Sequence, residues 1–158
     1  MESLKKKDGD APDLAAVVAE IPYAQFLGLT VDKKGNEITT VMKFADHLIG
    51  NPVLPALHGG TIGALMETTA IIQLAYETSG IENLPKPVDI TIDYLRSGRP
   101  VDTYARAKIT KQGRRVANVH VEAWQEDRSR PIAAAHGHFL IKSVEPEKAS
   151  DMSADSKA

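Results

Sequence analysis

Glu67 is the residue that first suggests chemistry, because it is the one formally charged side chain strictly between residues 46 and 77. The apolar residues around it recur at helical spacing and predict a long helix, beginning near Thr61, that is buried on nearly every side. A carboxylate in such a helix is costly unless it is paired, hydrogen-bonded or protonated. Two interpretations follow: a structural acid satisfied by Thr68, Gln73 or a distant Arg, or a catalytic acid held at a raised pKa in a dry site.

The residues that precede this helix indicate a binding site at its beginning. Asn51 lies in a loop that contains two prolines, and His58, Gly59 and Gly60 stand directly before the helix. Two glycines allow the backbone to approach a ligand closely, and the free N–H groups of a first helical turn favour negative charge. This arrangement suits an oxyanion, although a tight turn would explain the two glycines equally well.

The elements that must position these residues are one long helix and about six strands. A short helix is expected after Pro12, and Gly35 marks a hairpin turn between two early strands. The long helix is predicted from about Thr61 to a C-cap near Gly80. Alternating residues predict strands over residues 38–44, 88–95, 101–110, 116–126 and 132–142, and one more before the hairpin turn.

This order of elements predicts the fold class. Four consecutive alternating strands favour an antiparallel meander, and one long apolar helix can be buried only if the sheet curls around it. We therefore expect an α+β domain over residues 11–143, with a long central helix wrapped by a curled antiparallel sheet of about six strands. Residues 1–10 and 144–158 are polar and are expected to be disordered tails.

Composition excludes several classes of function. The chain has 158 residues, a formal net charge of −2 and no Cys. The charge gives no general attraction to nucleic acid or to an anionic membrane, and the lack of Cys rules out disulfides, a thiolate nucleophile and cysteine metal sites. No segment has the composition of a membrane span or a secretory signal. A cytoplasmic protein without nucleic-acid or membrane partners is expected.

The sequence resembles the hotdog-fold acyl-CoA thioesterases of the phenylacetate-degradation and 4-hydroxybenzoyl-CoA types over roughly residues 20–143. The resemblance rests on Asn51, on His58-Gly59-Gly60 followed by Glu67, and on the segments VDITIDYLR and KQGRRVANVHVEAW. It implies a thioester hydrolase that converts an acyl-CoA to a carboxylic acid and free CoA, without a metal or other cofactor. The family's dimers join two sheets edge to edge and build each active site across the interface, and many members pair such dimers into tetramers.

The resemblance also implies roles for individual residues. Glu67 would attack the thioester carbonyl or activate a water to do so, and the N–H of Gly59 would donate to the oxyanion. Asn51 would position the water or the carbonyl, and His58 would orient the loop or the thioester. The neighbouring residues Gly60 and Thr68 would contact the substrate.

Two groups of cations could bind the phosphate-rich end of CoA. Lys111, Arg114 and Arg115 lie at one predicted turn, and Arg96 and Arg99 at another. An ordinary solvated turn remains the alternative for any single cation.

Two other functions remain open on the same fold. The segment HLIGNPVLP resembles the His-containing loop of hotdog acyl-carrier-protein dehydratases, so His47 and Glu67 would act together in a dehydratase or hydratase. A non-catalytic acyl-CoA-binding hotdog protein is the third possibility. His136 and His138 share a strand face, as metal ligands can, but a surface or interface pair is the expected interpretation.

Overall fold

The structure of the protein is a computed structural model that describes residues 12–78 and 83–141. The predicted tails over residues 1–10 and 144–158 lie outside the described residues. In chain order the elements are α1 (Leu14–Ala19), α2 (Pro22–Phe26), β1 (Leu29–Lys34), β2 (Glu37–Met42), the short 3₁₀ helix η1 (Asp46–Leu48), β3 (Ile49–Asn51), β4 (Ala56–Leu57), α3 (Gly59–Glu77), β5 (Lys86–Tyr94), β6 (Thr103–Gln112), β7 (Val116–Trp124) and β8 (Ala133–Leu140).

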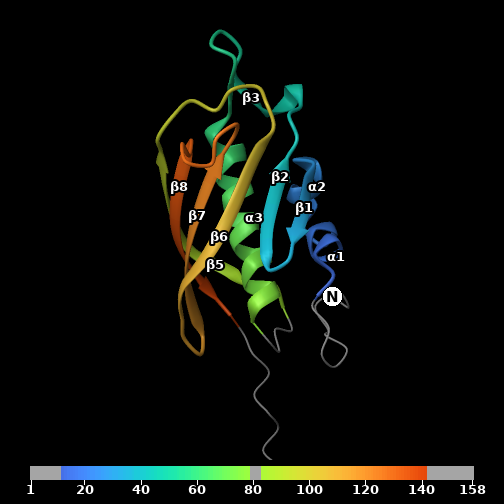
Figure 1. Ribbon diagram of the computed structural model, residues 1–158, viewed down its shortest axis with the longest axis vertical. Coiled ribbons are helices and arrows are strands. Elements are labelled where there is room, and N and C mark those ends of the chain that lie inside the picture. The colour runs from blue at the N-terminus through green and yellow to red at the C-terminus, as the bar shows by residue number, and fades with distance from the viewer. Residues whose placement is uncertain (1–11, 79–82, 142–158) are drawn as a thin grey trace, which may run out of the picture.

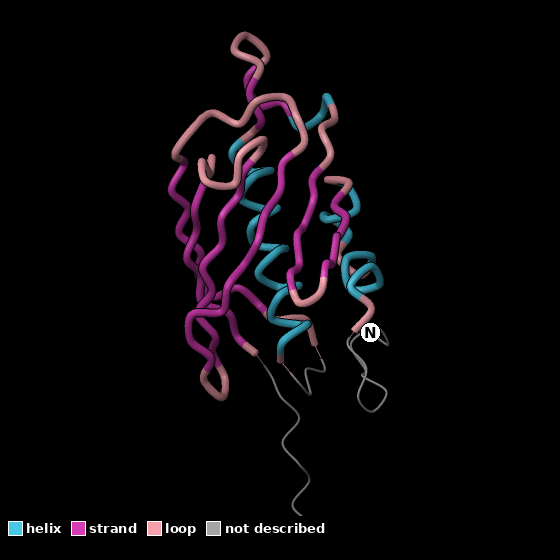
Figure 2. The backbone as a smooth tube through the Cα atoms, in the orientation of Figure 1, coloured by secondary structure: helices cyan, strands magenta, loops and turns pink. Residues whose placement is uncertain are grey.

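The six longer strands form one antiparallel sheet in the order β1-β2-β6-β7-β8-β5, and its inner face holds α3 (Figure 1). The tube in Figure 2 shows the sheet curling around this helix, while α1 and α2 lie beside β1. This is the hotdog arrangement that the sequence predicts, with the expected number of strands.

The predicted meander of four strands is wrong for its first member. β5 does not pair with β6 but lies at the far edge of the sheet, where Ile90 is opposite Gly137 of β8. Crossing from β5 over β8 and β7 to β6 spans about 14 Å, which the connection over residues 95–102 covers easily. Alternation identifies a strand and its two faces but not its neighbour, and for this reason the order was not predictable.

The central helix differs from its prediction at the beginning. It starts at Gly59 rather than Thr61, and His58 is its N-cap. It ends at Glu77 with Thr78 as the C-cap, and the predicted cap residue Gly80 lies outside the described residues. The short helix α2 and the small β3–β4 ribbon were not predicted.

Small residues explain how α3 fits inside the curled sheet. The inward faces of β7 and β8 are buried and carry Ala117, Ala123, Ala133, Ala135 and Gly137 among larger side chains. Short side chains allow a helix to approach a sheet closely. The edge strand β5 is different: no residue along it is fully buried within the protomer.

Candidate active site

The first turn of α3 leaves one backbone donor unused. The N–H of Gly60 donates to Nδ1 of His58 at 2.9 Å, and the N–H of Thr61 donates to the His58 carbonyl at 3.0 Å. The N–H of Gly59 finds no acceptor among the described residues. Because the first N–H groups of a helix carry its positive end, this donor is suited to an oxyanion.

Tyr94, at the end of β5, packs directly on Gly59. Its hydroxyl donates to the Gly59 carbonyl at 2.7 Å, and a Cβ added to Gly59 would lie 3.1 Å from the Tyr94 Cζ. The close approach of this ring explains why residue 59 is glycine. From the sequence, Tyr94 was placed only within the strand predicted over residues 88–95 and this contact was missed, because the edge position of that strand was not predictable.

Gly59 and Tyr94 line an open hollow of about 530 Å³ at this end of the molecule. The backbone N–H of Leu57 donates to the Gly98 carbonyl at 2.9 Å, which joins the loop before α3 to the connection after β5. The other lining residues are Ala56, Ile62, Leu95, Arg96 and Ser97. Gly59 therefore borders an accessible space, which we call the mouth.

Glu67 lies near the middle of α3 and is half-buried. Burial raises the pKa of its carboxyl above the ordinary value of 4.5. No hydrogen bond or ion pair to Glu67 is present within residues 12–78 and 83–141, and Gln73 donates to Glu77 instead, at 2.5 Å. Thr68 is buried next to it. The carboxylate is thus left without the polar partners that a structural acid needs.

One side of α3 faces the edge strand. A Cβ on Gly59 would meet Tyr94, and a Cβ on Gly63 would lie 2.9 Å from Cδ1 of Ile92. Glu67 lies four residues beyond Gly63 on the same side of the helix. Because β5 runs in the opposite direction, the strand residue at the level of Glu67 is Ile90, two residues before Ile92. Glu67 therefore lies on the α3 side nearest the open edge of the sheet.

The distance along the helix separates the two groups within one protomer. At 1.5 Å per residue, Glu67 lies about 12 Å beyond Gly59 along the axis. An oxyanion donor and an attacking group that share one carbonyl are each about 3–3.5 Å from it, which allows about 7 Å between them. The backbone positions of Gly59 and Glu67 in a single protomer are further apart than this, so the Glu67 side chain would have to extend fully toward the beginning of the helix to close the gap.

Asn51 and His58 are both committed to local structure. Oδ1 of Asn51 accepts from the N–H groups of Val53 and Leu54 at 3.0 and 3.1 Å, which stiffens the loop beyond β3. The Nδ2 amide of Asn51 is therefore the part of its side chain that could donate a hydrogen bond to a ligand. His58 accepts the Gly60 N–H on Nδ1, so its neutral ring carries a proton on Nε2.

The predicted cations do not gather in one place. Arg96 lines the mouth, and its Nη1 donates to the Pro131 carbonyl at 2.8 Å. Lys111, Arg114 and Arg115 lie at the β6–β7 turn, at the other end of the sheet (Figure 1). Next to this turn, Gln112 donates to Thr78 at the end of α3 at 3.1 Å, which is about 28 Å from Gly59 along the helix.

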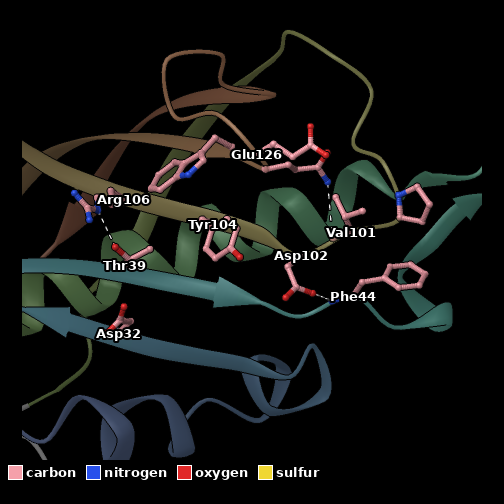
Figure 3. Close-up of a pocket in the computed structure, with 11 residues that line it drawn as sticks. Asp32, Thr39, Phe44, Val101, Asp102, Tyr104, Arg106 and Glu126 are labelled. Carbon is pink, nitrogen blue, oxygen red and sulfur yellow. Dashed lines mark hydrogen bonds between the residues drawn. The ribbon is translucent and has the colours of Figure 1, made fainter.

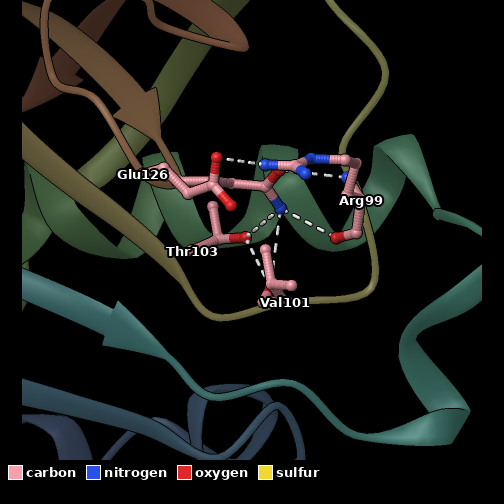
Figure 4. A network of polar contacts seen from close by, with 5 residues as sticks. Arg99, Val101, Thr103 and Glu126 are labelled. Atoms are coloured by element: carbon pink, nitrogen blue, oxygen red, sulfur yellow. Dashed lines mark hydrogen bonds and ion pairs between the residues drawn. The ribbon is translucent and has the colours of Figure 1, made fainter.

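A network around Gln125 holds the connection that carries Arg96 and Arg99. The buried Gln125 side chain accepts from the Arg99 N–H at 3.0 Å and donates to the Arg99 carbonyl at 2.8 Å and to the Thr103 hydroxyl at 3.1 Å. Arg99 also forms an ion pair of 2.5 Å with Glu126 (Figure 4). Arg99 is thus occupied within the protein, whereas Arg96 borders the mouth.

A second hollow, larger than the mouth, is not the site of these residues. A groove of about 870 Å³ lies over β2 and β6, where Tyr104 and Arg106 border it (Figure 3). These two side chains flank Ala105, which is buried against the inner face, so the groove lies on the outer face of the sheet. Glu67 and Gly59 do not line it.

The histidines form separate contacts. Nδ1 of His136 is 3.4 Å from Nδ1 of His120, and His138 pairs with Asp89 at 2.8 Å. Nε2 of His47 bonds the Phe26 carbonyl at 3.1 Å, so His47 is held against α2 and not beside Glu67. Within the described ranges, no group of three or more His, Asp or Glu side chains could hold a metal ion.

Comparison with known proteins identifies relatives of the whole domain. Residues 54–132 match the family model of the thioesterase superfamily. The chain is 25% identical over 137 residues to the medium/long-chain acyl-CoA thioesterase YigI of Escherichia coli (strain K12), which covers 78% of this chain and 88% of that protein. None of the helices in the described part of the chain is long and apolar enough to cross a membrane.

Solved structures share the fold. A protein from Chromobacterium violaceum superposes with a TM-score of 0.67 at 41% identity, covering 84% of this chain and 91% of that one. A phenylacetic acid degradation-related protein from Ralstonia eutropha JMP134 superposes with a TM-score of 0.64 at 21% identity, covering 80% and 98%. The second likeness supports the fold alone.

Proposed function

The chain belongs to the thioesterase superfamily and is a thioester hydrolase, and we propose that its substrate is an acyl-CoA, which it hydrolyses to a carboxylic acid and free CoA. The observation that carries this proposal is a pair of groups on α3 that have no polar partner among the described residues: the N–H of Gly59 and the carboxylate of Glu67. A relative that acts on medium/long-chain acyl-CoA supports the choice of carrier. No metal or other cofactor enters the reaction.

In the proposed reaction the two groups act on opposite sides of one carbonyl. The thioester oxygen accepts the Gly59 N–H, which stabilises the negative charge that develops as the carbonyl carbon is attacked. The attacking group is either a water whose proton passes to the Glu67 carboxylate or the carboxylate itself. The C–S bond then breaks, and CoA leaves as the thiolate and takes up a proton. If a water attacked, the acyl group leaves at once as the acid; if the carboxylate attacked, the acyl group is first held on Glu67 as a mixed anhydride, which a water hydrolyses to the acid and free Glu67.

This reaction requires two copies of the chain. Because Gly59 and Glu67 of one protomer lie about 12 Å apart along α3, each site must combine the Gly59 of one protomer with the Glu67 of another. The edge strand β5 offers the surface for this, since Val88 and Tyr94 on its inward side are 65% and 54% exposed. We propose a homodimer joined antiparallel through β5.

The position of Gly63 indicates where the twofold axis passes. Gly63 lies midway between Gly59 and Glu67 and faces Ile92 of β5. A twofold axis near Ile92 would therefore place each Gly59 opposite the partner's Glu67, and it would cover the half-buried side of α3. Pairing of such dimers into tetramers remains a prediction, as does a cytoplasmic location.

The proposed dimer determines which cations are the better candidates for binding the phosphates of CoA. Arg96 borders the mouth of its own protomer and is the first candidate for the phosphates. Lys111, Arg114 and Arg115 could reach that mouth only from the partner, because antiparallel pairing brings opposite ends of the two sheets together. In the dimer they would lie about 15–20 Å from the β5 strand of the protomer whose mouth they serve, measured across the partner's sheet. Asn51 and His58 stay proposed as the groups that orient the thioester.

Subunit mixing tests the shared site directly. Glu67→Gln removes the base or nucleophile, and Gly59→Pro removes the oxyanion N–H at a helix position that tolerates proline. His58 has φ −64° and ψ 129°, the extended conformation that a residue before proline requires. Gly59→Ala is the control, because it adds a side chain but keeps the N–H.

The expected result is complementation between two inactive variants in a free-thiol release assay. Co-refolding Glu67→Gln with Gly59→Pro should give heterodimers in which one of the two sites is intact, so about a quarter of the wild-type activity should return. No recovery with proven heterodimers would contradict the shared site. A wild-type protein that binds acyl-CoAs of every chain length but releases no thiol would favour the non-catalytic binding protein instead.

A further inference from the structure

The hydroxyl of Tyr94 makes a contact that the reaction above does not use. It donates to the Gly59 carbonyl at 2.7 Å, from the end of β5 to the first residue of α3. The ring lies against Gly59 closely enough that a Cβ there would be 3.1 Å from Cζ and 3.2 Å from the hydroxyl oxygen. Tyr94 thus holds the first residue of α3 against the edge strand by two contacts, a hydrogen bond to its carbonyl and the packing of the ring on its Cα.

Gly59 is the first residue of α3, and its N–H and its carbonyl belong to two neighbouring peptide groups that are linked through its own backbone torsions. Its N–H has no intrahelical partner, and glycine has the greatest backbone freedom of any residue. On the other side, His58 is fixed by the Gly60 N–H on Nδ1 at 2.9 Å and by the Thr61 hydroxyl on its carbonyl at 2.7 Å. Tyr94 supplies the remaining restraint, on the carbonyl of Gly59 itself.

We propose that Tyr94 is a positioning residue, whose hydroxyl holds Gly59 so that its N–H stays aimed at the thioester oxygen. This inference rests on the proposed function of Gly59 as the oxyanion donor. A donor that is already oriented stabilises the developing charge without reorganising during the reaction, which is how such groups accelerate acyl transfer. Tyr94 acts through Gly59 and need not touch the reacting atoms.

Kinetics of Tyr94→Phe separate this role from a structural one. Loss of one hydrogen bond of ordinary strength should lower kcat about three- to tenfold, with KM unchanged, since the contact is needed in the transition state and not for substrate binding. Tyr104→Phe is the matched control. Tyr104 lies on the outer face against Trp124, with ring centroids 6.1 Å apart, and should keep the wild-type kcat.

A double-mutant cycle tests whether Tyr94 works through Gly59. In the Gly59→Pro background the N–H is absent, so Tyr94→Phe should lower kcat no further. A wild-type kcat for Tyr94→Phe, or a full additional loss in the Gly59→Pro background, would overturn the inference. Thermal melting of each variant checks that the fold is kept.

A measurement that needs no turnover tells this inference apart from the proposed function. In protein labelled with ¹⁵N-glycine, the amide signals of Gly59 and Gly60 should move in Tyr94→Phe, while those of the distant Gly35 and Gly113 stay in place. Unmoved Gly59 and Gly60 signals would refute the positioning role even in an active enzyme. Moved signals in a protein without thioesterase activity would leave the restraint standing and refute the proposed function.

Discussion

The two ends of α3 differ in how many of their polar groups are already satisfied. At the end of the helix the Thr78 N–H donates to the Leu74 carbonyl at 2.9 Å, and the Thr78 hydroxyl accepts from Gln112 at 3.1 Å. At the beginning, the Gly59 N–H has no acceptor within the described part of the chain, and Gly59 borders the mouth. Thr78 is thus held by the helix and by one side chain at the closed end, whereas the open beginning keeps a backbone donor without an acceptor.

Exposed cations lie at both ends. Lys111, Arg114 and Arg115 lie at the closed end, whereas Arg96, Arg99 and Arg130 lie at the open end. Charge therefore does not single out one end as the proposed reacting centre. The backbone donor and the half-buried carboxylate are the better basis for the proposal, because unsatisfied groups in a partly dry site are costly unless they have a function.

The largest expected effect comes from the carboxylate. Glu67→Gln keeps the size and hydrogen-bonding capacity of the side chain but removes the base or nucleophile, so turnover should fall about a hundredfold to ten-thousandfold. The measurement is free-thiol release from acyl-CoAs of short, medium, long and aromatic chains. Glu77→Gln, at the exposed end of the same helix, is the matched control. Turnover of Glu67→Gln within a few-fold of the wild type would remove the assigned role.

The next largest effect concerns the free donor. Gly59→Pro should lower kcat about a hundredfold to a thousandfold, as loss of an oxyanion donor does in other acyl-transfer sites. Gly59→Ala keeps the donor and must only displace the Tyr94 ring by a few tenths of an ångström. It should therefore lose much less activity. Equal losses in both variants would mean that the added side chain, and not the missing N–H, causes the defect.

The sequence was most informative where a residue broke a local pattern. Glu67 interrupts an apolar helix, and the two glycines interrupt the approach to it, so the acid and the donor end of the helix were predictable from composition along a short segment. The alternation over residues 116–126 and 132–142 likewise predicted the two strands that the structure contains as β7 and β8. These features depend on neighbours within a few residues.

What the sequence did not yield depends on distant parts of the chain. The strand order places β5 at the sheet edge through its pairing with β8, and no pattern within residues 86–94 encodes that partner. The basic turn was predicted to bind the phosphate-rich end of CoA, and the sequence did not show that the length of α3 puts this turn at the opposite end of the protomer from Gly59. Tyr94 was missed for the same reason, since its hydroxyl partner Gly59 is 35 residues away.

The two basic regions should differ in their effect on substrate binding. Arg96→Ala should raise KM for acyl-CoA about tenfold with little change in kcat, because a charge-assisted contact to phosphate holds the ground and transition states alike. Arg114→Ala with Arg115→Ala should raise KM less, because those residues are exposed and would act only from the partner. For acyl-pantetheine, which lacks the nucleotide, both variants should have the same KM as the wild type.

Salt provides the control for this comparison. Added salt should weaken binding of acyl-CoA to the wild type more than to the Arg114 and Arg115 double variant, since exposed charges are screened most. A larger KM effect at the β6–β7 turn than at Arg96 would reverse the assignment of the two ends. Selective loss of acyl-carrier-protein substrates in the double variant would instead assign the turn to an acidic protein surface.

The smallest expected effect is on stability, and its sign is set by the raised pKa of Glu67. A raised pKa means that folding favours the protonated carboxyl, so the folded protein binds more protons than the unfolded chain between the ordinary and the raised pKa. The stability of the wild type should therefore be greatest below this window and fall as the pH rises through it. Thermal melts from pH 4 to pH 8, at a fixed protein concentration, measure the slope.

Glu67→Gln should flatten this slope and melt at the same temperature as the wild type, or slightly higher, at neutral pH, because glutamine places no charge on the half-buried side of α3. Over the same window the wild-type kcat/KM should rise with pH, because the ionised form is the reactive one. Stability and activity then change in opposite directions around a single carboxylate, which a structural acid stabilised by partners would not do. A variant that melts well below the wild type at neutral pH would show that the Glu67 charge stabilises the protein, and the carboxylate would have to be reassigned to its structure.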